Sequence, residues 1–258
     1  KMGLRALELT DVMPSTKTPV PATQALSLQD VGLTYQKTPI LEHLTLNASP
    51  GEVIGITGNN GAGKTTFCRA VCGLHKEHTG VFAWNGKPVN DQQRRQRTYL
   101  VMQDVNYELF ADSVEAECSF GIKQPDHELV ETAMEDLGLL PYRTRHPYTL
   151  SGGQKQRTAA AVSLVCGKEL LIFDEPTSGL DFDSMCQLSK LITTLTQKGA
   201  IIFIVTHDFE FLCKTCTRVL YFNQRRLDSD FPVCLENLAR LRKIFSIANG
   251  NIPEGKIS

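Results

Sequence analysis

The chain lacks any apolar run that approaches the roughly 20 residues of a membrane-spanning helix. Its longest candidates, Leu170–Phe173 and Ala200–Val205, have the length of strands, and no secretory signal is recognisable. The net charge of −1 offers no excess of Lys and Arg to hold a phosphate backbone, so no nucleic-acid partner is expected. A small basic cluster, Arg94, Arg95 and Arg97, is interpreted as a solvated face. Any membrane part of the function is expected from another chain.

The eight cysteines also lack the spacing of a disulfide or metal framework. Cys68 and Cys72 lie four apart on a predicted helix, where free cysteine is typical of a small apolar side chain. Cys213 and Cys216 form a C-x-x-C pair, but no second Cys or His pair follows at the spacing of a four-ligand zinc site. We therefore expect reduced thiols without a metal or redox role.

Turn and strand patterns divide the chain into segments. Residues Lys1–Gln24 hold Pro14, Pro19 and Pro21 between Ser and Thr, which is typical of a linker. Strands that alternate apolar and polar residues are predicted at Leu26–Gln36 and Ile40–Ala48. Buried strands are predicted farther along, at 52–57, 81–84, 98–102, 170–173, 200–206 and 219–222, with helices at 64–72, 114–142 (interrupted at Pro125) and 153–166.

This order predicts an α/β fold with a parallel-sheet core, an N-terminal antiparallel β subdomain and a small helical subdomain. The expected boundaries are a linker at 1–24, a main domain at 25–230 with its helical subdomain at about 104–152, and a helical tail at 231–258.

A glycine-rich loop provides the first chemical motif. The stretch Gly58–Thr65 reads G-x-x-x-x-G-K-T between a predicted strand and a predicted helix, the context that a phosphate-binding P-loop requires. Glycines let backbone N–H groups point at a phosphate, and the following helix adds the positive end of its dipole. Lys64 is expected at the β- and γ-phosphates of ATP and Thr65 on Mg²⁺. The expected nucleotide-binding residues are Asn59, Asn60, Gly61, Ala62, Gly63, Lys64, Thr65 and Thr66.

Two carboxylates end an apolar strand and provide the second motif. Asp174 and Glu175 follow Leu170–Phe173. Oxygen ligands suit Mg²⁺, so Asp174 is predicted to hold the ion. Glu175 is then placed to orient and polarise the attacking water.

A third motif, Leu150-Ser151-Gly152-Gly153-Gln154, opens a predicted helix at Gly153 and makes a second anion site at a helix N-terminus. One ATP does not need two such sites from one chain unless the site is shared between chains. With this pentapeptide, the stretch from about Leu26 to Leu227 resembles the ATP-binding cassette (ABC) family. The resemblance implies a head-to-tail dimer in which ATP on one P-loop is capped by Ser151, Gly152, Gly153 and Gln154 of the other chain.

The resemblance also implies roles for single residues. Tyr35 is similar to the aromatic residue that stacks on adenine, and Gln103 to the glutamine that touches Mg²⁺ and the water. Asp181, in Ser178-Gly179-Leu180-Asp181, resembles the acid that communicates across the dimer, and His207 the switch histidine at the γ-phosphate. Glu175, His207 and Gln103 are therefore the expected catalytic residues, and Thr65, Gln103 and Asp174 the metal ligands.

The stretch from Gln103 to Gly121 is similar to the ATPases of energy-coupling-factor and cobalt-type importers. This implies a subunit at the cytoplasmic face of the membrane that powers import of a vitamin or metal ion together with a membrane subunit. Tyr107, Leu109 and Phe110 are expected to contact that subunit, and Val114 and Phe120 to complete the subdomain core. The alternatives are an exporter ATPase, a soluble cassette acting on ribosomes or nucleic acid, and a non-hydrolysing subunit. Lys1–Gln24 is interpreted as the linker from a preceding cassette.

Overall fold

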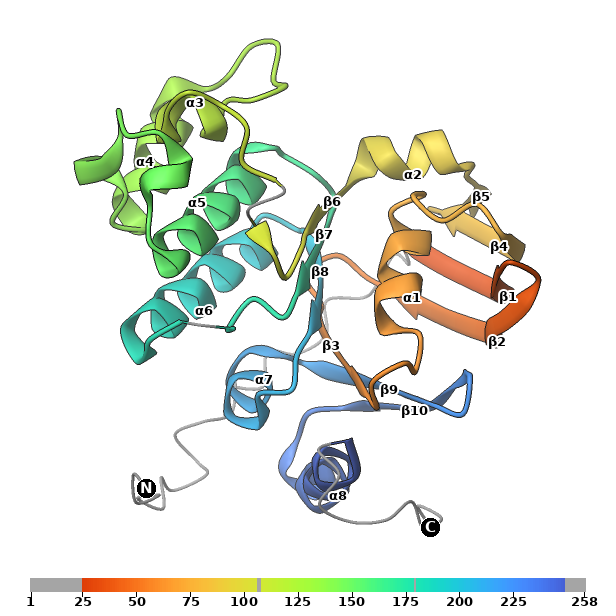
Figure 1. The fold of residues 1–258 in the computed structure, drawn as a ribbon. Helices are drawn as coiled ribbons and strands as arrows, with labels where there is room; N and C mark the ends of the chain where they lie inside the picture. The colour runs from red at the N-terminus through yellow and green to blue at the C-terminus, as the bar shows by residue number, and fades with distance from the viewer. Residues whose placement is uncertain (1–24, 106–107, 179, 249–258) are drawn as a thin grey trace.

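The computed structural model describes residues 25–105, 108–178 and 180–248, so the predicted linker at Lys1–Gln24 lies outside the described residues. These ranges form an α/β fold in which two β-sheets lie side by side and helices cover them (Figure 1). The predicted fold class is confirmed. None of the helices in these ranges has both the length and the apolar character needed to cross a membrane.

The first sheet is antiparallel, with four strands in the order β2-β1-β4-β5. Gln36 and Lys37 connect the first two strands with φ values of 48° and 65°, as a two-residue hairpin turn with both central residues left-handed requires. The inward side chains of this sheet are apolar, as its alternating pattern predicts. The strands are β1 (Leu26–Tyr35), β2 (Thr38–Ala48), β4 (His78–Trp84) and β5 (Lys87–Pro88).

The second sheet has six strands in the order β10-β9-β3-β8-β7-β6, parallel except for the antiparallel edge strand β10. Because β3, β8 and β7 are parallel neighbours, their carboxyl ends meet at one edge of the sheet. The chain that leaves this edge carries the P-loop after β3, the two carboxylates at the end of β7 and His207 after β8. The strands are β3 (Val53–Gly58), β6 (Thr98–Val101), β7 (Leu170–Asp174), β8 (Ile201–Val205), β9 (Arg218–Asn223) and β10 (Arg226–Pro232).

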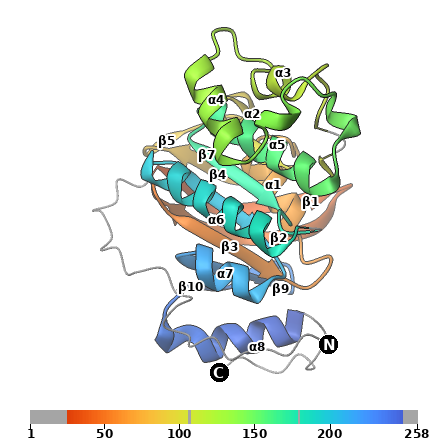
Figure 2. The same cartoon turned by 90° about the vertical axis from the view of Figure 1, so that its left-hand side faces the viewer.

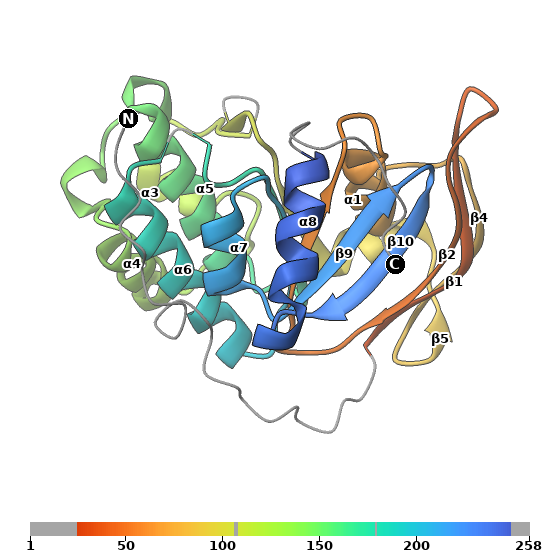
Figure 3. The ribbon, with the colours of Figure 1, turned by 90° about the horizontal axis from the view of Figure 1, so that it is seen from below.

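Helices cover both faces of the parallel sheet, which explains why its central strands β3, β8 and β7 are almost wholly buried. One helix, α1 (Lys64–Val71), packs in the core between the two sheets. The other face is covered by α5 (Gly152–Val165), α6 (Phe182–Gln197), α7 (Phe209–Thr215) and α8 (Leu238–Ala248). Figure 2 shows α6 lying across this face, and Figure 3 shows α8 beside α7 and β9.

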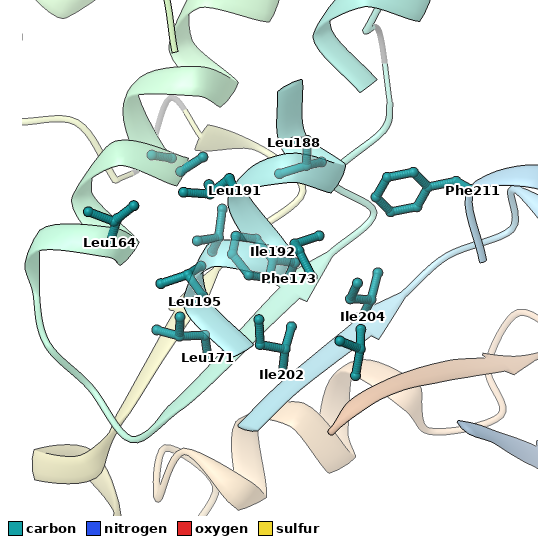
Figure 4. Close-up of a cluster of buried hydrophobic side chains, with 14 of the residues drawn as sticks. Leu164, Leu171, Phe173, Leu188, Leu191, Ile192, Leu195, Ile202, Ile204 and Phe211 are labelled. Carbon is teal, nitrogen blue, oxygen red and sulfur yellow. The ribbon is translucent and has the colours of Figure 1, made fainter. Parts of the chain in front are cut away.

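The apolar stripe of α6 shows how the helices are held against this face of the parallel sheet. Its buried residues recur at helical spacing, and they pack on side chains of β7 and β8 such as Phe173 and Ile204 (Figure 4). Each fully buried side chain of this size contributes about 1.5–3 kcal/mol relative to an exposed one. The stripe consists of Leu188, Leu191, Ile192 and Leu195.

The helical subdomain contains two short helices that pack on α5. The stretch 114–142, predicted as helical with a break at Pro125, contains α3 (Val114–Cys118), α4 (His127–Asp136) and a 3₁₀ turn at Leu140–Tyr142. Asp126 directly after Pro125 accepts hydrogen bonds from the backbone N–H groups of Glu128 and Leu129, so the break is also the N-cap of α4. A second 3₁₀ turn, Pro147–Thr149, leads into α5.

The basic cluster Arg94–Arg97 was wrongly interpreted as a wholly solvated face. It lies on α2 (Asp91–Arg97), where Arg94 is only 2% exposed. The Arg94 guanidinium lies 3.7 Å from the ring centroid of Phe82, and its Nη2 donates to Asp91 Oδ1 at 2.6 Å. A stacked and paired guanidinium tolerates burial that an isolated cation does not.

The predicted domain end at residue 230 falls inside β10, which the sequence analysis did not predict. After β10, a 3₁₀ turn at Leu235–Asn237 leads into α8. Leu241, Ile244 and Phe245 of α8 are buried in the same core as α5, α6 and α7. Residues 249–258 of the predicted tail lie outside the described ranges.

Candidate active site

The predicted phosphate-binding loop joins β3 to α1, and its glycines are required by close packing. Gly58 and Gly63 have φ values of 151° and 94°, conformations that residues with a side chain rarely adopt. A Cβ atom on Gly58 would lie 2.2 Å from the carbonyl oxygen of Phe222, and one on Gly63 would lie 2.9 Å from Leu41 Cγ. The loop is therefore seated against β9 and β2 in a way that only glycine permits.

Lys64 is the first residue of α1, and its side chain turns back over the loop. It is 8% exposed, and Nζ donates to the carbonyl oxygens of Gly58 at 2.7 Å and Asn59 at 3.1 Å. Burial lowers the pKa of Lys64, while the carboxylates of Glu175 and Asp174 act in the opposite direction. A buried ammonium beside a helix N-terminus concentrates positive charge where an anion can be held.

Thr65 and Asp174 come together from α1 and the end of β7. Thr65 Oγ1 donates to Asp174 Oδ2 at 3.3 Å. Burial raises the pKa of Asp174, and the Thr65 hydrogen bond and Lys64 partly offset this. A hydroxyl and a carboxylate oxygen this close together form the kind of donor set that Mg²⁺ prefers, so these two residues fit the ion.

Glu175 and His207 follow neighbouring strands and face each other. Glu175 Oε1 lies 3.3 Å from His207 Nε2, and the His207 backbone N–H donates to Glu175 Oε2 at 3.4 Å. Burial, with a smaller contribution from Asp174, raises the pKa of Glu175 to about 7. Burial and Lys64 lower the pKa of His207. The arrangement places a carboxyl group with a raised pKa beside an imidazole with a lowered pKa, a combination that suits acid–base chemistry.

Ser151 and its neighbours lie at a different place in the same chain. Ser151 is the N-cap of α5, where its Oγ accepts from the Gln154 N–H and the Gln154 side chain accepts from the Ser151 N–H at 2.8 Å. Gly152 begins the helix, one residue before the predicted start at Gly153, and a Cβ there would meet no atom within 4 Å. Figure 1 shows α5 and α1 on opposite sides of β6, β7 and β8. The P-loop and this helix N-terminus do not converge within one chain.

Three further predicted site residues lie at the ends of elements. Gln103 follows β6 and is exposed, and its carbonyl oxygen accepts from Gln156 Nε2 at 3.4 Å. Asp181 is the N-cap of α6, where hydrogen bonds from Ser184 lower the pKa of its carboxylate. Tyr35 ends β1 and is 59% exposed, so its ring is free to stack on a ligand. The motif residue Gly179 lies outside the described residues.

The expectations for the stretch after Gln103 need two corrections. Leu109 is 2% exposed and belongs to the core, so it is not a surface contact residue. Phe120, predicted to complete the core, is 60% exposed because α3 ends at Cys118 and the chain turns outward there. Phe110 is 63% exposed and Val114 is fully buried, as predicted, while Tyr107 lies outside the described residues.

One polar contact near the site was not predicted. Arg157, on the second turn of α5, donates from Nη1 to Ser184 Oγ at 2.8 Å and so joins α5 to the N-terminal turn of α6. The sequence signal for this contact was the position of Arg157, six residues after Ser151. The contact links α5, which is capped by Ser151, to Ser184, whose backbone N–H donates to the N-cap Asp181.

The cysteine pair Cys213 and Cys216 consists of two buried free thiols. Burial raises the pKa of Cys213 to about 11 and that of Cys216 still further, which makes both thiols unreactive. Among the residues that the structure describes, no three His, Cys, Asp or Glu side chains form a group that could hold a metal ion.

Comparison with known proteins agrees with this geometry. Residues 41–178 match the model of the ABC transporter family. An ABC transporter ATP-binding protein of Treponema denticola is 43% identical over 85% of this chain and 46% of its own length. The energy-coupling factor transporter ATP-binding protein EcfA1 of Mycoplasma pneumoniae is 29% identical over 79% of this chain and 77% of its own.

A solved structure described as cbiO1 from Clostridium perfringens, part of the ABC transporter complex cbiONQ, superposes with a TM-score of 0.72. It is 28% identical and covers 88% of this chain and 99% of its own. The chain spans about half the length of the Treponema denticola relatives that it matches. The family match covers more than half of the chain and includes the P-loop and both carboxylates. This chain is therefore an ATP-binding domain of the ABC transporter family, a family of ATPases.

Proposed function

We propose that this domain hydrolyses Mg·ATP to power a membrane transporter. The observation that carries the proposal is the convergence, at the carboxyl edge of β3, β7 and β8, of the Thr65–Asp174 pair with the facing pair of Glu175 and His207. Lys64 lies between the loop and these carboxylates. Phosphoryl transfer needs positioning and charge neutralisation more than covalent chemistry, and these groups supply both.

In the proposed reaction, Asn59 to Thr66 hold the phosphates and Lys64 exchanges its bonds to the loop carbonyls for phosphate oxygens. Thr65 and Asp174, with Gln103, hold Mg²⁺. When bound there, Mg²⁺ neutralises charge on the phosphates. Glu175 orients the attacking water and accepts its proton, and His207 keeps the Glu175 carboxylate in place and contacts the γ-phosphate. Tyr35 stacks on the adenine.

We further propose that the site is completed by a second cassette. The N-terminus of α5 is open at Gly152, where a side chain would meet nothing within 4 Å, yet it lies away from the P-loop of its own chain. In a head-to-tail pair, Ser151–Gln154 of each cassette would cap the ATP of the other, and Asp181 would lie at the contact. The second cassette is a copy of this chain or the other part of a longer one, since the Treponema denticola relatives are about twice as long as the matched stretch.

The importer class is proposed from likeness to named relatives. EcfA1 and cbiO1 both match over three quarters or more of their own length. An exporter remains the alternative, because the chain also superposes on an Atm1-family ABC exporter, but at 22% identity that likeness shows the fold alone. We therefore propose an energy-coupling-factor type importer of a vitamin or metal ion, with this domain bound at the cytoplasmic face of the membrane.

Phe110 and Phe120 are the proposed contacts to the membrane subunit. Both rings are more than half exposed, and both adjoin Glu117, which accepts from the Phe110 N–H and whose carbonyl oxygen accepts from the Phe120 N–H. Exposed aromatic residues this close together suit the apolar face of a short helix of a partner.

Phosphate release from ATP by the purified domain tests the proposed chemistry, and copurification with the membrane subunit tests the coupling. The expected result is release that stops when EDTA removes Mg²⁺. Phe110→Ser with Phe120→Ser should leave release nearly unchanged and abolish copurification. The matched control is Leu235→Ser, which removes an equally exposed apolar side chain elsewhere on the surface. Release that continues in EDTA would contradict the proposed chemistry.

A further inference from the structure

The backbone on both sides of Gln103 is held by the carboxylates of two glutamates. Before it, the Met102 N–H donates to Glu108 Oε1 at 2.6 Å. After it, the N–H groups of Phe110 and Ala111 donate to Glu117 Oε2 at 2.7 and 2.6 Å. Hydrogen bonds of this length to a carboxylate are among the stronger ones in proteins. Met102, Phe110 and Ala111, which lie outside strands and helices, are therefore held by side chains.

Glu117 is an unusual residue to find in this place. It is 2% exposed, and it lies on α3 beside Glu115, which is paired with Arg143. Arg143 also pairs with Glu131. A buried carboxylate that is satisfied by backbone N–H groups costs desolvation that an apolar residue would avoid. The hydrogen bonds from the Phe110 and Ala111 N–H groups offset part of that cost.

Glu108 lies close enough to Glu117 for their charges to interact. Its Oε2 is buried and has no hydrogen-bond partner within the described part of the chain. Burial raises the pKa of Glu108 to about 7, the Met102 N–H lowers it, and the charge of Glu117 raises it again. Tyr99 of β6 also lies near both carboxyl groups, which together with burial raise the pKa of its hydroxyl. The titratable groups around Glu108 are thus Glu117 from α3 and Tyr99 from β6.

We propose that Glu108 and Glu117 are positioning residues that fix the placement of Gln103 relative to β6 by holding the backbone before and after it. This inference rests on the role of Gln103 given under the proposed function. A displacement of about 1 Å at a reacting group can cost on the order of 10²-fold in rate. Leu109, which lies between Met102 and Phe110 in the chain, is buried, so its apolar side chain also holds this segment in place.

The carboxyl groups of Glu108 and Glu117 also make their hold on this backbone segment sensitive to pH. The pKa of Glu108 lies above its ordinary value. The stability that protonated Glu108 contributes to the folded segment is therefore complete below the usual glutamate range, and it is lost as pH rises through about 7. Above that pH a second negative charge lies beside Glu117. The Met102 N–H favours the charged form of Glu108, but burial and Glu117 outweigh it, so the segment should open more readily as pH rises. Glutamine at position 108 should remove that dependence.

Hydrogen exchange and steady-state ATPase kinetics of the full chain test the proposal together. In Glu117→Ala, the Phe110 and Ala111 amides should exchange at least about tenfold faster than in the wild type. Its kcat should fall by about tenfold to 10²-fold with KM for ATP within about twofold, because placement rather than binding is lost. Glu117→Gln, which keeps an acceptor oxygen, should recover most of kcat. The control Glu115→Gln removes a charge from the same helix and should leave kcat and this exchange unchanged.

Exchange of the Met102 amide, corrected for its intrinsic rate, should accelerate between pH 6 and pH 8 in the wild type and stay constant in Glu108→Gln. Folded Glu117→Ala with wild-type kcat and exchange would overturn the proposal. So would a kcat loss that Glu117→Gln does not relieve. Gln103→Ala distinguishes a failure of the proposed function from a failure of this inference. Unchanged kcat in that variant refutes the role of Gln103. The exchange of the Met102, Phe110 and Ala111 amides still tests whether Glu108 and Glu117 hold the backbone.

Discussion

Single residues at the end of β7 show how backbone conformation prepares a side chain for chemistry. Glu175 has φ 50°, a left-handed conformation that is uncommon for a residue with a side chain. Its N–H still donates to the Val205 carbonyl oxygen at 2.9 Å, so the ladder with β8 continues through it. The reversed φ directs the carboxyl group to His207 rather than along the strand. Strain of this kind is typical of functional sites.

Replacing Glu175 should separate binding from turnover. Glu175→Gln keeps the shape of the side chain but removes the base, so the variant should bind Mg·ATP and hydrolyse it about 10²-fold more slowly. Lys64→Ala should instead weaken nucleotide binding, because the charge that meets the phosphates is lost. A nucleotide-binding titration and a phosphate-release assay on each variant distinguish the two effects. Wild-type turnover in Glu175→Gln would refute its assignment.

Sequence motifs predicted the residues that come together at the site more accurately than they predicted the residues that are buried. Lys64, Asp174 and Glu175 were expected at one site, and the structure brings them together because parallel neighbouring strands end at the same edge. The burial of Arg94 was missed, since charge alone suggests a solvated face. Its partner Phe82 lies on another element, which a local pattern does not reveal. Leu109 and Phe120 were missed for the same reason.

Arg94 should therefore contribute to stability while its neighbour Arg97 should not. Arg94→Met removes the stacking on Phe82 and leaves Asp91 without its close cation, and should lower the free energy of unfolding by about 1–3 kcal/mol. Arg97 pairs with Glu169 at 3.4 Å, and both side chains are partly exposed. Arg97→Met should therefore change the free energy of unfolding by less than about 1 kcal/mol. Urea unfolding of both variants makes the comparison. Equal losses would mean that burial of the guanidinium contributes little.

Among the elements, α5 has the most varied contacts. Its first turn is capped by Ser151 and Gln154, and Gln156 and Arg157 on its second turn reach the Gln103 carbonyl and Ser184. Its run of alanines lets it pack closely on the helical subdomain and on α6. The helix was predicted from its composition, with a start one residue late. Strand β10 was not predicted, because its polar residues alternate too weakly to indicate an edge strand.

Mixing two inactive variants tests whether the N-terminus of α5 serves another chain. Gly152→Asp should repel the γ-phosphate and fill the space that Gly152 leaves open. Lys64→Ala and Gly152→Asp proteins should each hydrolyse ATP slowly, and their mixture should regain activity, since one of the two sites in a mixed pair is intact. The control is a mixture of Lys64→Ala with the double variant Lys64→Ala, Gly152→Asp, which restores no site. A mixture no more active than its components would argue for sites within one chain.

At the scale of the whole molecule, the described residues form two apolar cores that share the parallel sheet. One lies between the two sheets and includes α1, and the other lies between the parallel sheet and α5, α6, α7 and α8. The alternation of strands and helices predicted the layers, but the strand order could not be predicted. Pairings such as β3 with β9 join residues that are far apart in the chain, and no local pattern records them. The division leaves the P-loop and the α5 N-terminus on opposite sides of β6, β7 and β8.

The most direct test of a shared site is the mass in solution of Glu175→Gln with and without Mg·ATP. Two phosphate-binding faces lined by Lys64 and helix N-termini should separate when no anion lies between them, and join when ATP is bound but not hydrolysed. Light scattering after size-exclusion chromatography should give a dimer with Mg·ATP, and a monomer without nucleotide or when Lys64→Ala is added. A monomer under all of these conditions would contradict the account.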